Sequence, residues 1–166
     1  MIELESIMKE VGCMKKYIYG ISVLIIIILI GIVCFFASNK KETNTTFKSQ
    51  KESDIKFDEK KINIYVFWGD GCPHCEELNS FFNNLDNKYK SYFNIYSFEV
   101  WNDDENNELM NKMASKLNEE AAGVPYIIIG KKTFTGYLSS MDKKIKKAIL
   151  DEYNNKGTND VYKNWN

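Results

Sequence analysis

The chain has 166 residues, of which 44% are hydrophobic and 27% are charged, and its formal net charge is −1. This is the composition of a globular protein with room for one domain. The near-neutral charge gives no reason to expect a nucleic-acid partner. Because all 22 basic residues are lysine, a bidentate phosphate-binding site is not expected either. Four cysteines are too few for a scaffold held together by disulfides.

The first notable stretch is residues 17–37, which carry no charge and are almost continuously apolar from Ile21 to Phe36. As a helix this stretch would extend roughly 30 Å, about the thickness of a hydrocarbon core. A cleavable signal peptide is the competing interpretation, but it needs a shorter apolar region and a small residue where this chain has Phe35. We therefore predict a retained transmembrane signal-anchor, preceded by a short segment, residues 1–16, whose start is Met1 or Met14.

The orientation of this anchor is not decided by its flanking lysines. Three lysines precede it and five follow it closely, and this count alone would place the C-terminal part in the cytoplasm. Long domains, however, translocate largely regardless of flanking charge. The chemistry of the following domain therefore has to decide the orientation.

Residues 38–60 are rich in Lys, Glu, Ser, Thr and Asn and contain only isolated apolar residues. A segment of this composition cannot bury enough surface to fold alone, so we predict a flexible polar linker. The folded domain is expected at residues 61–154, and a polar C-terminal tail at residues 155–166.

Within that domain the apolar patterns predict alternating strands and helices. Short apolar or β-branched runs predict strands, and apolar residues at helical spacing predict helices. A helix N-cap is expected at Ser139 or Ser140. The elements expected, in chain order, are strands at 62–67 and 93–101, a helix between them from 73, a helix at 103–117, a hairpin at 126–135 and a last helix to Tyr153. The order is βαβαββα, an α/β fold.

The motif Cys72-Pro73-His74-Cys75 falls on the turn between the first strand and the first helix. Pro73 occupies the first helical position, where proline is tolerated because its missing N–H would have no partner in the helix. Cys72 then lies at the helix N-terminus, where the helix dipole favours a negative charge. A thiolate is the species that disulfide exchange requires, so position and chemistry agree.

In this context the motif resembles that of the thioredoxin superfamily. The resemblance covers residues 62–153 and includes Trp68 before the motif and Val124-Pro125 before the third strand. It implies a three-layer α/β core, a cis Val124–Pro125 bond and a substrate-binding role for Val124 and Pro125. Trp68 is expected either to pack beneath the site or to line a substrate groove. The Pro-His pair is similar to that of the oxidising, DsbA-like members.

The helix position assigns Cys72 as the exposed attacking thiol and Cys75, one turn further in, as the buried resolving thiol. His74, when protonated, is expected to stabilise the Cys72 thiolate. Nearby acidic residues oppose this effect, namely Asp70, Glu76 and Glu77. Many members of the superfamily have a buried carboxylate where this chain has Val66, so proton transfer at Cys75 would need water or another group.

Other uses of the cysteine pair remain open. A structural zinc site would need further ligands, but the other cysteines are Cys13 and Cys34 and the only histidine is His74. A non-catalytic copper-binding thiol module is the alternative from another functional class.

The sequence thus predicts a membrane-tethered thiol–disulfide oxidoreductase with catalytic residues Cys72, Cys75 and His74 and no metal or cofactor. Its expected partners are extracytoplasmic protein thiols and disulfides and a protein that recycles its cysteines. The expected location is the outer side of a bacterial cell membrane. Oxidation or isomerisation is the favoured direction, and a thioredoxin-like reductant is the alternative.

Overall fold

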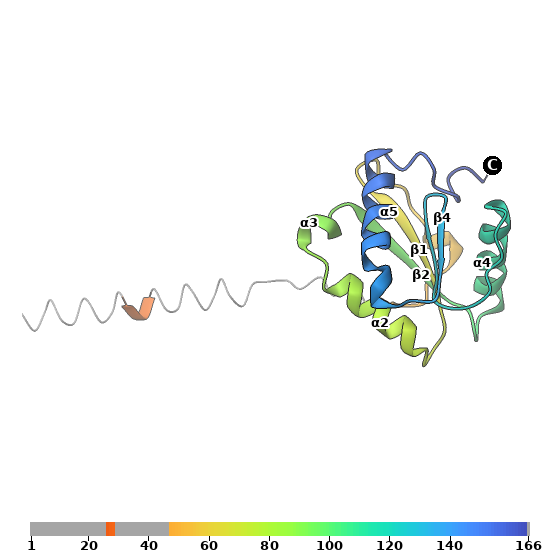
Figure 1. Cartoon of the computed structure of the whole chain (residues 1–166), viewed down its shortest axis with the longest axis horizontal. Coiled ribbons are helices and arrows are strands. Elements are labelled where there is room, and N and C mark those ends of the chain that lie inside the picture. Colours follow the sequence, from red (N-terminus) through yellow and green to blue (C-terminus); the bar gives the residue numbers. More distant parts are fainter. Residues whose placement is uncertain (1–25, 29–46, 166) are drawn as a thin grey trace, which may run out of the picture. The chain divides into compact units, whose positions relative to one another are not determined.

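Four strands form one mixed sheet in the computed structural model, which describes residues 26–28 and 47–165 (Figure 1). The order across the sheet is β2-β1-β3-β4. Strand β1 pairs in parallel with β2 and antiparallel with β3, and β3 and β4 form an antiparallel hairpin. The strands are β1 (Ile62–Trp68), β2 (Phe93–Glu99), β3 (Tyr126–Ile129) and β4 (Lys132–Thr135).

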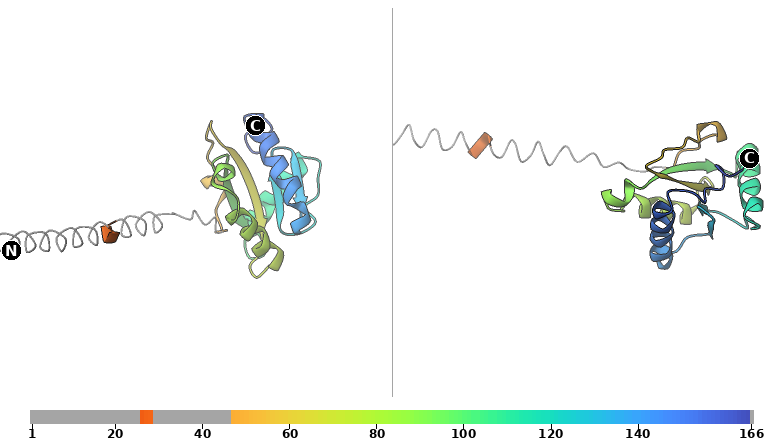
Figure 2. Two further views of the ribbon diagram at one scale, coloured as in Figure 1. Left: turned by 60° about the vertical axis from the view of Figure 1, so that its left-hand side comes forward. Right: turned by 90° about the horizontal axis from the view of Figure 1, so that it is seen from above.

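Helices cover both faces of this sheet, and their order confirms the predicted βαβαββα arrangement. One short additional helix, α3, precedes β2. The α-helices are α2 (Pro73–Asn83), α3 (Asn87–Lys90), α4 (Asp104–Lys116) and α5 (Asp142–Asn154), and the 3₁₀ turns are η1 (Glu52–Asp54) and η2 (Ser139–Met141). Figure 2 gives two further views of the same elements.

Two hydrophobic cores lie on opposite faces of the sheet because strand side chains alternate between the faces. On one face α2 and α5 contribute residues such as Leu78 and Ile149. On the other face α4 contributes Leu109 and Met113, which pack with Tyr65 and other strand residues. The sheet is therefore the middle of three layers. This layering is the α/β core that the sequence predicted.

Part of the segment predicted as a linker packs against the domain. Phe47 lies against the core beneath α2, and Ile55 lies against the core beneath α4. Residues 48–50 also satisfy the backbone of β2: Gln50 N–H donates to the Ser97 carbonyl (2.9 Å), and Ser97 N–H donates to the Gln50 side chain (2.9 Å). The prediction of a flexible linker is therefore wrong for residues 47–55. Apolar packing and hydrogen bonds to the edge strand β2 attach these residues to the domain.

The C-terminal segment after α5 is also part of the folded domain. Val161 is buried in the core beneath α4, and Asp160 is buried with it. The Tyr65 hydroxyl donates to both carboxylate oxygens of Asp160, at 2.9 and 3.0 Å. Residues 155–165 were predicted as a polar tail after the domain, but Val161 and Asp160 pack within it, so the predicted end of the domain at residue 154 is too early.

Two other predictions concern the ends of helices and the anchor. The start of α5 has no side-chain cap, and Ser139 and Ser140 form the 3₁₀ turn η2 before it, so the predicted serine N-cap is wrong.

The predicted anchor at residues 17–37 lies outside the described residues except for Ile26–Ile28, which are helical. Within the described parts of the chain, no helix has the length and apolar composition needed to cross a bilayer.

Candidate active site

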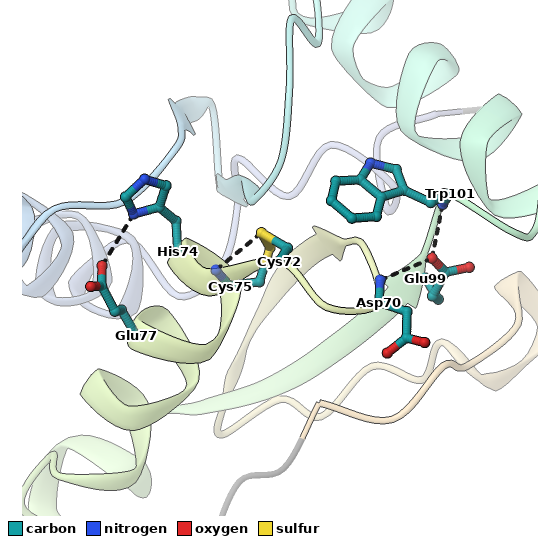
Figure 3. Close-up of a disulfide and its surroundings, with 7 residues drawn as sticks. All are labelled: Asp70, Cys72, His74, Cys75, Glu77, Glu99 and Trp101. Carbon is teal, nitrogen blue, oxygen red and sulfur yellow. Dashed lines mark hydrogen bonds and ion pairs between the residues drawn. A yellow bond between two sulfur atoms is a disulfide. The ribbon is translucent and has the colours of Figure 1, made fainter.

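A disulfide joins Cys72 and Cys75 at the N-terminus of α2, with Cα atoms 5.3 Å apart (Figure 3). Cys72 is the N-cap and Pro73 is the first helical residue, as predicted. The Cys75 backbone N–H donates to the Cys72 sulfur at 3.2 Å. After reduction the same N–H would face a thiolate, and the helix dipole would add to its stabilisation. The local backbone is therefore arranged to favour a charged sulfur at Cys72.

The turn that places Cys72 depends on Gly71. Its φ angle is +73°, in the left-handed region that glycine adopts without strain. The Cys72 N–H donates back to the Gly69 carbonyl at 3.2 Å, which closes the turn between β1 and α2. The chain thereby passes from the end of a buried strand to the first turn of a helix in four residues, Gly69 to Cys72.

The two cysteines differ little in exposure. Cys72 is 5% exposed and Cys75 is 3% exposed. The expectation of an exposed Cys72 is therefore wrong for this oxidised state, in which each bonded sulfur shields part of the other. The distinction between attacking and resolving thiol rests on their positions in the helix and not on accessibility.

His74 lies on the surface and faces away from the disulfide (Figure 3). Its Nδ1 atom lies 3.2 Å from Glu77 Oε2, one turn further along α2, and both side chains are more than half exposed. In this oxidised state the imidazole is paired with Glu77, and the predicted stabilisation of the Cys72 thiolate by His74 stays a prediction.

A buried carboxylate, Glu99, connects the loop before Cys72 to the loop after β2. Glu99 is 8% exposed and accepts hydrogen bonds from three backbone N–H groups: Asp70 at 3.3 Å, Trp101 at 2.9 Å and Asn102 at 2.9 Å. Several N–H donors can satisfy a buried carboxylate without a cation. Glu99 was not predicted from the sequence, since an acidic residue at the end of a strand predicts solvent exposure.

Trp101 is a second residue near the disulfide that the sequence analysis assigned no role. It is 58% exposed, and its indole ring extends from the β2–α4 loop toward the disulfide (Figure 3). A methyl group on Gly69 would collide with the ring, so the ring lies directly on the backbone of that glycine. The parallel pairing of β1 and β2 was the available signal, because the carboxyl ends of parallel strands meet at one edge of a sheet.

Trp68, the aromatic residue that the sequence analysis did select, is the last residue of β1. It is half-buried, and its indole N–H is buried with no hydrogen-bond partner among the described residues. Of the two expectations for Trp68, packing beneath the site agrees better with this burial than lining a groove does.

Val124 and Pro125 lie at the same end of the sheet as the cysteines. Tyr126 pairs with Phe67 in the antiparallel register, so the preceding Pro125 falls beside the end of β1. The Val124–Pro125 bond is cis, as the resemblance implies. Pro125 is buried and Val124 is half-buried against the core beneath α4. Their predicted role in binding a substrate strand stays a prediction.

The described residues contain no group of three or more His, Cys, Asp or Glu side chains placed to share a metal ion. Any metal at the cysteines would therefore be held by the two sulfurs without a further cluster from these parts of the chain.

The family model of the thioredoxin-like domain matches residues 34–153, which is most of the chain. The chain belongs to the thioredoxin-like domain family. A search of curated proteins finds no significant match. The family membership agrees with the mixed sheet, the three layers and the cysteine pair at the start of the first long helix.

Proposed function

We propose that this thioredoxin-like domain is a thiol–disulfide oxidoreductase that acts on other proteins through Cys72 and Cys75. The observation that carries the proposal is the disulfide at the N-terminus of α2, with the Cys75 N–H directed at the Cys72 sulfur. A thiolate at a helix start is suited to attack a disulfide, and a second thiol one turn away is suited to resolve the product.

In the oxidising direction a substrate thiolate attacks one sulfur of the Cys72–Cys75 disulfide, which breaks and leaves a mixed disulfide with Cys72. A second substrate thiolate then attacks the substrate sulfur and releases Cys72. The substrate gains a disulfide and the domain gains two electrons and two protons. A second protein with a disulfide or quinone oxidant would have to reoxidise the pair.

The direction of exchange is proposed as oxidation or isomerisation on the resemblance of the Pro-His pair. In the oxidised state the imidazole of His74 is paired with Glu77 and not with the sulfur. Reduction remains the alternative, and the two make different predictions for the reduction potential. Thioredoxin-like reductants lie near about −270 mV, and strong oxidants lie near about −120 mV.

We further propose that residues 17–37 anchor the protein in a bacterial cell membrane with the domain on the outer side. The absence of charge over residues 17–37 supports an anchor, and Ile26–Ile28 are helical with each side chain at least 53% exposed. An oxidising role supports the outer side, because disulfides persist in oxidising compartments.

Equilibration of the purified full chain with glutathione buffers tests the proposed activity. We expect one two-electron transition in the wild type and none in Cys72→Ser or Cys75→Ser. We also expect the reduced protein to reduce a peptide disulfide in a reaction that both substitutions abolish. A chain that binds Cu⁺ tightly but shows no exchange would contradict the proposal and would support the copper-binding alternative.

A further inference from the structure

The exposed face of Trp101 is an apolar feature beside the disulfide that the exchange chemistry does not use. Trp101 is 58% exposed and lies on Gly69, three residues before Cys72 (Figure 3). Single exposed apolar residues are common on protein surfaces and need no special explanation. Trp101 is different because of where its ring lies and how its backbone is held.

The backbone of Trp101 is fixed to the loop that carries the cysteines. One carboxylate oxygen of Glu99 accepts the N–H groups of both Trp101 and Asp70, at 2.9 and 3.3 Å. Glu99 itself is 8% exposed, so the accepting side of these hydrogen bonds is shielded from solvent. The backbone of Trp101 is therefore held at a fixed place relative to the loop that carries the cysteines before any partner binds.

The absence of a side chain at Gly69 completes this arrangement. A Cβ atom there would overlap the indole ring, whereas the neighbouring Gly71 has open space around it. One face of the ring thus lies on the main chain of the β1–α2 loop and the rest of its surface faces solvent. An aromatic side chain has only two rotatable bonds and here already packs on main chain, so it binds an apolar side chain at a low entropic cost.

We propose that Trp101 is a specificity-determining residue for the polypeptides that exchange disulfides with Cys72. The substrate class is an extended chain with an aromatic or large aliphatic residue next to its reacting cysteine. That side chain packs on the indole while the cysteine sulfur reaches Cys72. This inference rests on the proposed exchange function and specifies its substrate.

The test uses the reduced full chain, prepared with dithiothreitol, and disulfide-containing peptides. The Cys72 thiolate attacks the peptide disulfide, which breaks to give a mixed disulfide and a peptide thiolate. Cys75 then attacks Cys72, which releases the second peptide thiol and leaves the domain oxidised. Two cyclic peptides are compared, with phenylalanine or glycine next to one cysteine, together with the small disulfide dithiodiglycolate.

We expect the wild type to react about threefold to tenfold faster with the phenylalanine peptide than with the glycine peptide, the range that an aromatic contact supplies. Trp101→Ala should remove this preference, and Trp101→Phe should restore most of it. Phe57→Ala is the control, because Phe57 is also an exposed aromatic residue, 50% exposed, but stacks on Tyr162 in the C-terminal segment. It should keep the wild-type preference.

Gly69→Ala provides a second, independent variant, because its methyl group should displace the indole while leaving Trp101 in the sequence. It should remove the preference in the wild-type background and have no further effect on the preference in the Trp101→Ala background. Equal losses with both peptides in Trp101→Ala, or a preference retained in that variant, would overturn the inference. A wild type that reacts with neither peptide nor dithiodiglycolate would overturn the proposed function and this inference with it.

Discussion

His74 Nδ1 and Glu77 Oε2 lie 3.2 Å apart across one turn of α2, with the imidazole directed away from the Cys72–Cys75 disulfide. In the oxidised state the only histidine of the chain is therefore paired with a carboxylate and not with a sulfur. Glu77 offsets the stabilisation that a protonated His74 can give a Cys72 thiolate, because its carboxylate pairs with the imidazole. The two residues should thus affect the reduction potential in opposite directions.

His74→Ala should lower the reduction potential of the cysteine pair, because the thiolate loses a stabilising cation. About 30 mV corresponds to about 1.4 kcal/mol for a two-electron couple, which is the size expected for one such contact. Glu77→Gln should raise the potential, and by less in the His74→Ala background. Glu76→Gln is the matched control, since it removes a charge from the same turn without contacting the imidazole. Glutathione equilibration measures all of these variants, and a potential that is unchanged in His74→Ala would mean that the helix terminus alone tunes Cys72.

Cys75→Ser should accumulate mixed disulfides through Cys72, because the resolving thiol is missing. Cys72→Ser should accumulate few mixed disulfides, because Cys75 lies inside the first turn of α2 and its N–H donates to the Cys72 position. Non-reducing electrophoresis after incubation with a disulfide-containing protein would show the adducts. Since both cysteines are buried to a similar degree, the reverse pattern would show that helix position does not assign the nucleophile.

Glu99→Gln should destabilise the domain, since glutamine offers one accepting oxygen in place of the carboxylate that accepts three backbone N–H groups. A buried donor left without a partner costs about 1–3 kcal/mol of the free energy of unfolding. Urea unfolding followed by circular dichroism measures the loss. Glu105→Gln is the control, because the Glu105 side chain is 83% exposed and pairs with Lys51 at the surface. Equal stabilities of the two variants would contradict the role assigned to Glu99.

Asp160 should make the stability of the domain depend on pH in an unusual direction. Burial raises the pKa of Asp160 above its ordinary value of 3.8. The folded state then holds the proton more tightly than the unfolded chain does. The contribution of Asp160 is therefore complete below 3.8 and is lost as the pH rises through the folded-state pKa. Relative to Asp160→Asn, the wild type should become less stable over that rise.

Asp151→Asn is the control of opposite sign for this measurement. Hydrogen bonds from Lys132 and Lys147 lower the pKa of Asp151, so its contribution is present above 3.8 and is lost as the pH falls. Urea unfolding of the three proteins at several pH values gives both differences. The assignment of Asp160 fails if the difference between wild type and Asp160→Asn does not change with pH.

The proposed topology predicts which cysteines a membrane-impermeant maleimide can reach in intact cells. After mild reduction Cys72 should be labelled from outside, whereas Cys13 should be labelled only after lysis. A variant with Cys72 and Cys75 both replaced by serine controls for other reactive thiols. Labelling of Cys13 alone from outside would place the domain in the cytoplasm and favour the reductant.

The strands, their order and the start of α2 were predictable because their signals are local. Apolar runs identify β1 and β3, and Pro73 after Cys72 identifies the first turn of α2. The contacts of Phe47 and Val161 were not predictable in this way. Each is one apolar residue in a polar segment, without a period of 2 or 3.6, and its partner is far away in the sequence.

The site was predicted less completely than the fold. The cysteines follow from their spacing, but the position of Trp101 requires knowing that β1 and β2 are parallel neighbours. The orientation of His74 depends on a choice between two acceptors at an exposed helix start. Glu77 and the Cys72 sulfur both lie within one helical turn of His74, and the sequence alone does not show which of them the imidazole contacts.

The hydrogen bonds between residues 48–50 and Ser97 also affect self-association. Strand β2 is at the edge of the sheet, and an unpaired edge can bind the edge of a second molecule. Residues 48–50 occupy the Ser97 N–H and carbonyl groups that such pairing would use. The opposite edge is β4, where Lys132 forms an ion pair with Asp151. The charge there disfavours pairing with a strand of a second molecule. Residues 48–50 are therefore expected to reduce aggregation of the domain through the β2 edge.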